Sequence, residues 1–301
     1  MKRLPKDPVK RARGIRAERL RRDRRNVGLD TIKQCLGLYS HCSNESLAYL
    51  FSILRSGRYD DVVFVALDAK AYEHSVREIG ISTLDTRDLT SLAPGSDLSA
   101  VISSNNYITQ QSKGKSGQRQ FKFGTSKRVD LRWVPWLLNK VPRTGSPDPL
   151  ITEKRNVILI GHAIGTDLSE LDKVPFQLDP EIDVLILETS LLCCEAFNGA
   201  TLLAPKLVEV VDLLGVSHEH VKLHNAGNDA NLTLKVLLKL AVESCASAEM
   251  TSQQWERRDL LAAVVEANKV GWPTEIDGMN PDLFKDAEIE AQKREQAVSG
   301  A

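Results

Sequence analysis

Four side chains in this sequence have the types and positions that metal-dependent hydrolysis requires. Asp68 ends an apolar run, Asp167 follows a glycine-containing turn, and His224 precedes Asp229 by five residues at the start of an apolar segment. Carboxylates are the ligands that hard divalent ions such as Mg²⁺ and Mn²⁺ prefer. An imidazole, with its near-neutral pKa, suits a general base. Together the four residues form a candidate catalytic centre.

Each of these residues also has a simpler structural interpretation. A histidine on a loop before a helix often serves as a cap or lies at the surface. Asp167 in the first turn of a helix is favourable with the helix dipole. Asn228 or Asp229 would be a suitable N-cap. The order of the blocks along the chain, and not any single residue, points to a functional site.

The flanking sequences predict the elements that position these residues. The β-branched apolar run 62–67 predicts a buried strand, with Asp68 at its carboxyl end. Residues 77–86 predict a second strand, antiparallel to the first. A buried strand from Asn156 leads through a turn into a helix that begins near Asp167. The segment 230–244 has the wide apolar face of a helix that packs on a sheet.

The residue patterns of these blocks resemble those of a known family. The motifs are LDAKAYE at 67–73, EIGISTLDT at 78–86, GHAIGTDL at 161–168 and HNAGNDA at 224–230. They are similar to the DEDDh group of RNase H-like 3′–5′ exonucleases, and in particular to a fungal branch linked to mRNA export. The resemblance covers roughly residues 60–245. It implies an α/β, RNase H-like fold: a mixed five-stranded sheet with helices on both faces.

The resemblance also implies a role for each residue. In the family pattern, Asp68 bridges two divalent ions, Asp167 helps to hold the second ion and Asp229 helps to hold the first. His224 is the general base that acts on the attacking water. Two ions about 4 Å apart stabilise the attacking and leaving oxygens of a phosphodiester. The implied cofactors are therefore two Mg²⁺ or Mn²⁺ ions, provided that the site functions.

Lys70 departs from the family pattern. The first family block is Asp-x-Glu, whose two acids face the same side of a strand, but here the sequence is Asp68-Ala69-Lys70. A lysine offers no lone pair to a metal ion and adds a positive charge. Three interpretations stay open. The site is inactive and the fold serves as a binding module; Glu73 or Glu78 is a substitute ligand; or the reaction uses one ion, or Lys70 as an electrostatic stabiliser.

A long insertion, about residues 105–154, mixes cations with aromatic residues. Basic residues interleaved with aromatics suit a surface that contacts phosphates and stacks bases. The alternative is a β-hairpin with its aromatics in the core; Phe123-Gly124-Thr-Ser126 resembles a family element, and we expect Trp133 and Trp136 to pack. The candidate nucleic-acid-binding residues are Lys113, Lys115, Arg119, Lys122, Lys127 and Arg128.

Both ends of the chain fall outside the predicted domain. We expect a basic disordered arm at 1–27, a helical leader at 28–58, the exonuclease-type domain at 59–246 and a polar, partly helical tail at 247–301. Residues 1–25 carry twelve Lys or Arg and three acids, a net charge of +9, so the remainder carries −9. Such an arm suits nuclear import or phosphate binding, or is a solvated tail.

Composition narrows the class of protein further. The five cysteines match no zinc spacing and suggest a reducing compartment. No apolar stretch reaches the ~18 residues of a membrane span, and no secretory signal is present. We therefore expect a cytoplasmic or nuclear homologue of a 3′–5′ exonuclease, acting on or near RNA rather than DNA, with its metal site impaired by Lys70. Protein partners in mRNA metabolism would fit. The alternative is a non-catalytic RNA or ribonucleoprotein scaffold.

Overall fold

The apolar run before Asp68 forms an inner strand of the sheet. The computed structural model describes residues 18, 23, 27–39, 61–72, 75–93, 95–109, 121–148, 150–171, 184–197, 205–245, 250–267 and 276–278. β1 (Val62–Tyr72) and β2 (Ser75–Asp85) pair antiparallel, as predicted, and both run beyond the apolar segments that signalled them. Their register places Lys70 opposite Glu78.

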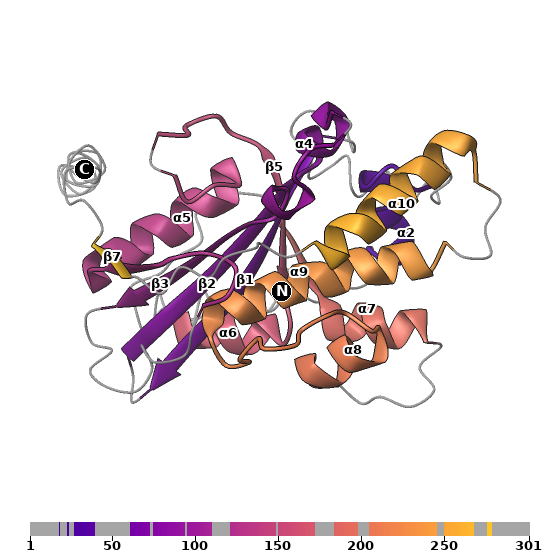
Figure 1. Cartoon of the computed structure of the whole chain (residues 1–301). Helices are drawn as coiled ribbons and strands as arrows, with labels where there is room; N and C mark the ends of the chain where they lie inside the picture. The colour runs from indigo at the N-terminus through magenta and orange to yellow at the C-terminus, as the bar shows by residue number, and fades with distance from the viewer. Residues whose placement is uncertain are drawn as a thin grey trace, which may run out of the picture.

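The sheet is mixed and has the strand order β6-β5-β1-β2-β3-β4-β7 (Figure 1). Its other strands are β3 (Ser103–Thr109), β4 (Ser126–Val129), β5 (Asn156–Gly161), β6 (Leu185–Glu188) and β7 (Ile276–Gly278). The pairs β1–β2 and β2–β3 are antiparallel, and the other four pairs are parallel. The carboxyl ends of β1, β3, β4, β5 and β6 therefore lie at the same edge of the sheet.

Helices cover both faces, as the RNase H-like fold class predicts. One face carries α2 (Leu29–Cys35), α7 (Thr189–Ala196), α8 (Leu207–Leu213), α9 (Ala226–Glu243) and α10 (Ser252–Glu266). The other carries α5 (Val134–Thr144) and α6 (Ile164–Leu171). Shorter pieces are α4 (Thr86–Ser91), η1 (Leu98–Ala100) and η3 (Leu131–Trp133). The fold class is confirmed.

The predicted strand number was wrong, because the described sheet has seven strands instead of five. β4 has four residues, two of which are Lys127 and Arg128, and β7 is a three-residue strand within the polar tail. Neither has an apolar run that would signal a strand. The hairpin interpretation of the insertion stays a prediction, because residues 110–120 lie outside the described residues; the strands on either side, β3 and β4, pair in parallel.

Some residues outside the predicted domain contact its sheet. Asp23 is fully buried, and its carboxylate accepts a hydrogen bond of 2.9 Å from the backbone N–H of Ile186 on strand β6. β7 extends the opposite edge of the sheet. Most of the predicted arm, leader and tail lie outside the described residues, so the domain boundaries stay predictions.

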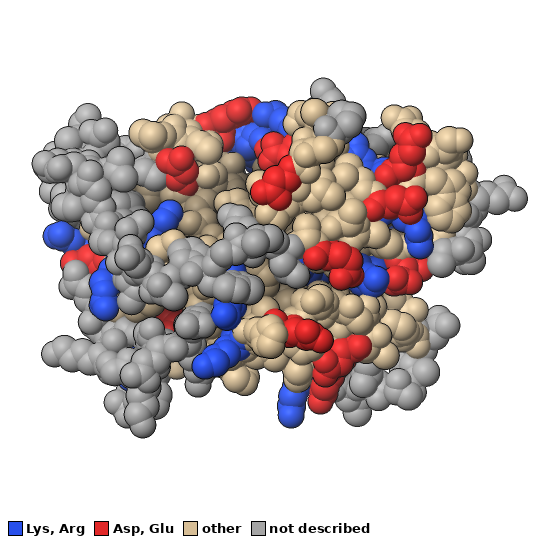
Figure 2. All heavy atoms as spheres, viewed as in Figure 1, with Lys and Arg blue, Asp and Glu red and all other residues tan. Residues whose placement is uncertain are grey.

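Charge is unevenly distributed over the surface. On the face shown in Figure 2, acidic side chains gather over the half that carries α8 and α10. This agrees with the net negative charge that the sequence assigns to residues 26–301. No helix of the described part of the chain is long and apolar enough to cross a membrane.

Candidate functional site

Side-chain alternation on β1 directs Asp68 and Lys70 towards α9. Val62, Phe64 and Ala66 belong to the core under α9, whereas the odd-numbered residues of the strand face α5 and α6. Successive strand residues point to opposite faces, so the next even-numbered positions, 68 and 70, continue on the α9 side. Strand β1 therefore places Asp68 and Lys70 on the same face of the sheet, as predicted.

Glycines bring the first turn of α9 against the sheet. A Cβ added to Gly80 on β2 would lie 1.8 Å from the backbone oxygen of Ala226, and one added to Gly227 would lie 2.6 Å from the Phe121 ring. No side chain fits in either gap. The helix starts at Ala226, four residues before the predicted start, and its N-cap is Asn225, whose side chain accepts from the N–H of Asn228. The interpretation of Asn228 or Asp229 as the N-cap was therefore wrong.

Lys70 joins Asp68 to Asp229. Its Nζ atom lies 2.9 Å from Asp68 Oδ2 and 2.7 Å from Asp229 Oδ2. Burial lowers the pKa of the ammonium, but the charges of Asp68 and Asp229 outweigh this and raise the pKa above its usual value. The lysine side chain is about one third exposed, and both carboxylates are mostly buried. Lys70 is thus a charged group that bridges two predicted metal ligands.

Asp167 lies in the first turn of α6, beside β1. Its Oδ1 atom accepts a hydrogen bond of 3.3 Å from the backbone N–H of Ala69. Its buried Oδ2 atom has no hydrogen-bond partner within the part of the chain that the structure describes. Burial and the charge of Asp68 raise the pKa of Asp167. Burial raises the pKa of Asp68 as well, and Lys70 offsets only part of that rise.

His224 lies immediately before α9, in a backbone conformation that is uncommon for residues other than glycine. Its φ is +67°, in the left-handed region. Its backbone N–H donates to both carboxylate oxygens of Asp229, at 3.1 and 3.2 Å, and its side chain is exposed. The structure therefore brings His224 and Asp229 together through the backbone. The role of the imidazole as a base stays a prediction.

Glu78, one of the two proposed replacement ligands, is on the site face but is already bound. It is 2% exposed. Its Oε2 atom accepts from the backbone N–H of Ala226 at 3.3 Å and from the side-chain amide of Asn225 at 3.4 Å. Glu78 therefore holds the start of α9. The other proposed ligand, Glu73, lies outside the described residues.

The structure places only part of the predicted nucleic-acid-binding set. Lys113, Lys115 and Arg119 lie outside the described residues. The backbone N–H of Lys122 donates to Asn228 Oδ1 at 2.8 Å, which attaches this segment to the first turn of α9. The Nζ of Lys127 donates to Asn105 Oδ1 at 3.2 Å, and Arg128 is exposed on β4. The rings at 121 and 123 are buried, so they pack in the core.

Sequence reasoning missed two groups around the site. Glu188 ends β6, accepts from the N–H groups of Ala163 and Ile164 at 2.8 Å each, and adds negative charge near Asp167. Its position after an apolar strand, like that of Asp68, was a usable signal. The side chain of Asn106 on β3 accepts from the Gly227 N–H at 3.0 Å. Nothing in the local sequence pairs those two residues.

The carboxylates do not fit a two-ion centre as they stand. Among the described residues, no group of three His, Cys, Asp or Glu side chains is arranged to hold a metal ion. The Lys70 ammonium instead contacts Asp68 and Asp229 at ion-pair distance. The Oδ2 of Asp167, which has no hydrogen-bond partner among the described residues, suits an added cation. The three carboxylates come together as predicted, but around a lysine.

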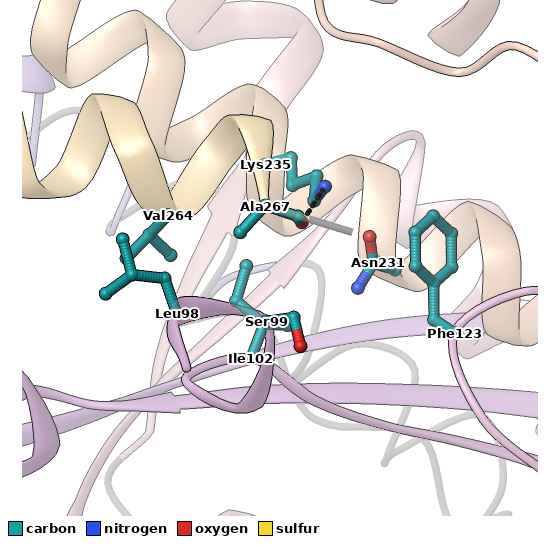
Figure 3. Close-up of a pocket in the computed structure, with 8 residues that line it drawn as sticks. All are labelled: Leu98, Ser99, Ile102, Phe123, Asn231, Lys235, Val264 and Ala267. Atoms are coloured by element: carbon teal, nitrogen blue, oxygen red, sulfur yellow. Dashed lines mark hydrogen bonds between the residues drawn. The ribbon is translucent and has the colours of Figure 1, made fainter. Parts of the chain in front are cut away.

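Lys235, a buried lysine, lines a small pocket elsewhere on α9 (Figure 3). The Nζ of Lys235 donates to the backbone oxygen of Ala267 at 2.9 Å, at the end of α10, and lies 5.4 Å from the centre of the Phe123 ring. Burial lowers the pKa of Lys235 to about 8. The pocket is lined by Leu98, Ser99, Ile102, Phe123, Asn231, Lys235, Val264 and Ala267.

A comparison with protein families assigns the domain. The model of the family described as DEDDh_C, DNA polymerase III subunit epsilon-like, C-terminal domain, matches residues 63–240, which is more than half of the chain. This range contains the carboxylates of the site, Lys70 and His224. No curated protein matches the chain. Members of the DEDDh exonuclease family usually use divalent metal ions. The sheet topology, the clustered carboxylates and this match agree, and the chain belongs to the DEDDh exonuclease family.

Proposed function

We propose that this chain is a nucleic-acid-binding homologue of DEDDh 3′–5′ exonucleases whose metal site is impaired by Lys70. The bridge from Lys70 Nζ to Asp68 and Asp229, at 2.9 and 2.7 Å, carries the proposal. The ammonium pairs with one carboxylate oxygen of Asp68 and one of Asp229, and each of these oxygens would otherwise be available to an ion. The lysine supplies positive charge to the cluster but no ligand atom.

The positive charge of Lys70 opposes the binding of a metal ion at this site. Two unit charges 4 Å apart repel by about 1 kcal/mol in water and by several times that in a partly buried site. A divalent ion beside the ammonium would meet twice that repulsion. The raised pKa of Lys70 keeps it charged throughout the ordinary pH range. An ion must therefore displace the ammonium from both carboxylates before it can bind between them.

The other two interpretations of the substitution have less support. Glu78 would have to release the N–H of Ala226 and the amide of Asn225 to become a ligand. Hydrolysis with one ion, or with Lys70 as a stabiliser of the reacting phosphate, keeps Asp167 and His224 in their family roles. If an ion does bind, Mg²⁺ or Mn²⁺ is the proposed species, held by Asp167 with Asp68 and Asp229, where it would activate water.

The ligand and the setting follow from the sequence resemblance. We propose RNA rather than DNA, protein partners in mRNA metabolism, and a cytoplasmic or nuclear location, because the motif wording is similar to a fungal branch linked to mRNA export. The second candidate function is a non-catalytic RNA or ribonucleoprotein scaffold that uses the same domain and the Arg-rich arm. The ion pairs of Lys70 with Asp68 and Asp229 favour it, because Lys70 then supplies part of the positive charge that an ion would otherwise provide.

A degradation assay separates these functions. Single-stranded RNA that carries its label at the 3′ end is incubated with Mn²⁺ and the wild type, Asp229→Ala, Lys70→Glu or Lys70→Gln. We expect little or no product from the wild type and release of the labelled 3′-terminal nucleotide by Lys70→Glu, which regains a ligand. Lys70→Gln is the matched control: it removes the charge without adding a carboxylate and should stay inactive.

Two outcomes would overturn the proposal. Robust degradation by the wild type that disappears in Asp229→Ala would mean a working enzyme that tolerates Lys70. Inactivity of Lys70→Glu, with Mn²⁺ failing to raise its melting temperature, would mean that Lys70 does not control the metal site, because an ion that binds only the folded state must stabilise it.

A further inference from the structure

The outward face of α5 combines cations and tryptophans without an acidic residue. It consists of Trp136, Asn139, Lys140 and Arg143 of α5 and is continued by Arg132 and Trp133 of η3; the side of the helix that faces the sheet is formed by buried residues such as Leu137 and Val141. No Asp or Glu occurs between Asp130 and Asp148. This stands out in a chain whose residues after 25 are net negative.

The cations on this face lie against the indole rings. The Arg132 guanidinium is 5.6 Å from the centre of the Trp133 ring, and the Lys140 ammonium is 5.8 Å from that of Trp136. Arg132 also forms a 3.5 Å ion pair with Asp130, yet its side chain remains 65% exposed. Both tryptophans are half-buried, with the core of the sheet on one side. The face therefore offers aromatic surface and positive charge in alternation.

The position of the face relates it to the carboxylate cluster. β4 ends at Val129 and leads through η3 directly into α5. Because β4 and β1 run in the same direction, the start of α5 is at the same edge of the sheet as Asp68 and Lys70, but α5 covers the face opposite to the one that carries their side chains. Arg128 on β4 is exposed just before it. From Val134 to Arg143 the helix axis rises by about 14 Å.

We propose that the outward face of α5 binds single-stranded RNA, with bases stacked on Trp133 and Trp136 and phosphates held by Arg132, Lys140 and Arg143. This rests on the proposed function and gives that function a docking surface. Stacking on aromatic side chains tolerates any base, and nearby cations neutralise the backbone. The buried rings of Phe121 and Phe123 cannot do this, whereas the α5 tryptophans are partly exposed.

The full chain is titrated with a fluorescein-labelled, twelve-nucleotide oligouridylate, and binding is followed by anisotropy at several salt concentrations. We expect the triple substitution Arg132→Gln/Lys140→Gln/Arg143→Gln to weaken binding at least tenfold. Each lost phosphate contact lowers the salt slope by about 0.7, so three contacts lower it by about 2. Unlabelled oligouridylate should quench tryptophan fluorescence in the wild type and quench it less in Trp136→Phe.

The chain offers a matched control pair. Trp255 and Arg258 on α10 have the same arrangement, 5.3 Å apart, at the opposite side of the view in Figure 1. Trp255→Phe/Arg258→Gln should leave affinity and salt slope unchanged. Wild-type binding that the α5 substitutions do not alter would overturn this inference alone. A wild type that binds no RNA even at low salt would overturn the proposed function as well.

Discussion

Two lysines of this protein lie in opposite surroundings. Lys70 lies between Asp68 and Asp229, whereas Lys235 lies beside Phe123 and a backbone carbonyl. Burial lowers the pKa of both ammonium groups. In the first case the carboxylates reverse the shift, and in the second Glu266 opposes it without reversing it. The neighbouring charges, and not the depth of burial, decide which lysine holds its proton firmly.

The comparison explains why the carboxylate cluster is compatible with a folded protein. Three mostly buried carboxylates on adjoining elements repel one another, and each would protonate or need a counterion. Lys70 provides one positive charge within ion-pair distance of two of them. The family usually obtains such charge from divalent ions. In this chain the side chain of Lys70, a residue of β1, supplies part of that positive charge.

The largest expected effect is that of Lys70→Met, which removes the charge but keeps the length of the side chain. Breaking a buried pair leaves uncompensated charge, and we expect the free energy of unfolding at pH 7 to fall by about 3 kcal/mol. Urea denaturation measures it. In Lys70→Met/Asp229→Asn the loss should be less than the sum of the single losses, because the two residues interact. Additive losses would contradict the bridge.

The site was predictable to the extent that it depends on alternation along a strand. The even spacing of Asp68 and Lys70 places both on one face, and the spacing of His224 and Asp229 places both at the start of α9. Glycine contacts were not predictable. The sequence shows Gly80 and Gly227, but only the fold shows that their missing side chains let α9 touch β2 and the segment at Phe121.

In the fold, too, some elements were predictable from the sequence and others were not. Strands with apolar runs, such as β1 and β5, were predicted, because burial on both faces requires continuous apolar sequence. β4 and β7 were missed because each is short and gains its place by pairing with a neighbour that lies far away in the chain. The start of α9 was placed too late since Gly227 and Asn228 disfavour a helix interior, although both suit its first turn.

Asp167→Asn should change how stability depends on pH. Burial raises the pKa of Asp167 to about 8, so between pH 4 and 8 the folded state binds more protons than the unfolded state. The contribution of this group is therefore present at low pH and is lost as pH rises. Asparagine can still accept from the Ala69 N–H. We expect no difference at pH 4 and a gain of at least about 2 kcal/mol at pH 8.

Urea unfolding of Asp167→Asn and the wild type across that range tests the prediction. Asp85→Asn, measured over the same range, is the control: it removes a carboxylate that forms an ion pair with Arg155. A constant difference between Asp167→Asn and the wild type at every pH would mean that Asp167 ionises as it does in the unfolded chain.

Lys235→Met should give the smallest effect, and one of opposite sign to that of Lys70→Met. Burial lowers the pKa of Lys235 from 10.5 to about 8, so the unfolded state binds more protons between these values and the lysine reduces stability below pH 8. This shift corresponds to about 3 kcal/mol. Loss of the bond to the Ala267 oxygen, a hydrogen bond from a charged group, offsets about 2 kcal/mol. A net gain of about 1 kcal/mol at pH 7 follows.

Thermal and urea unfolding at pH 7 and pH 9.5 distinguish the cost of burying the charged ammonium from the gain from its hydrogen bond to Ala267. At pH 9.5 the wild-type lysine is largely neutral in the folded state, so the advantage of methionine should disappear or reverse. Lys239→Met, on the same helix but paired with Glu243 at 3.2 Å, should change stability by less than about 0.5 kcal/mol at either pH. If Lys235→Met instead loses about 3 kcal/mol at pH 7, as expected of Lys70→Met, then Lys235 is a charged partner in the core, and the contrast between the two lysines fails.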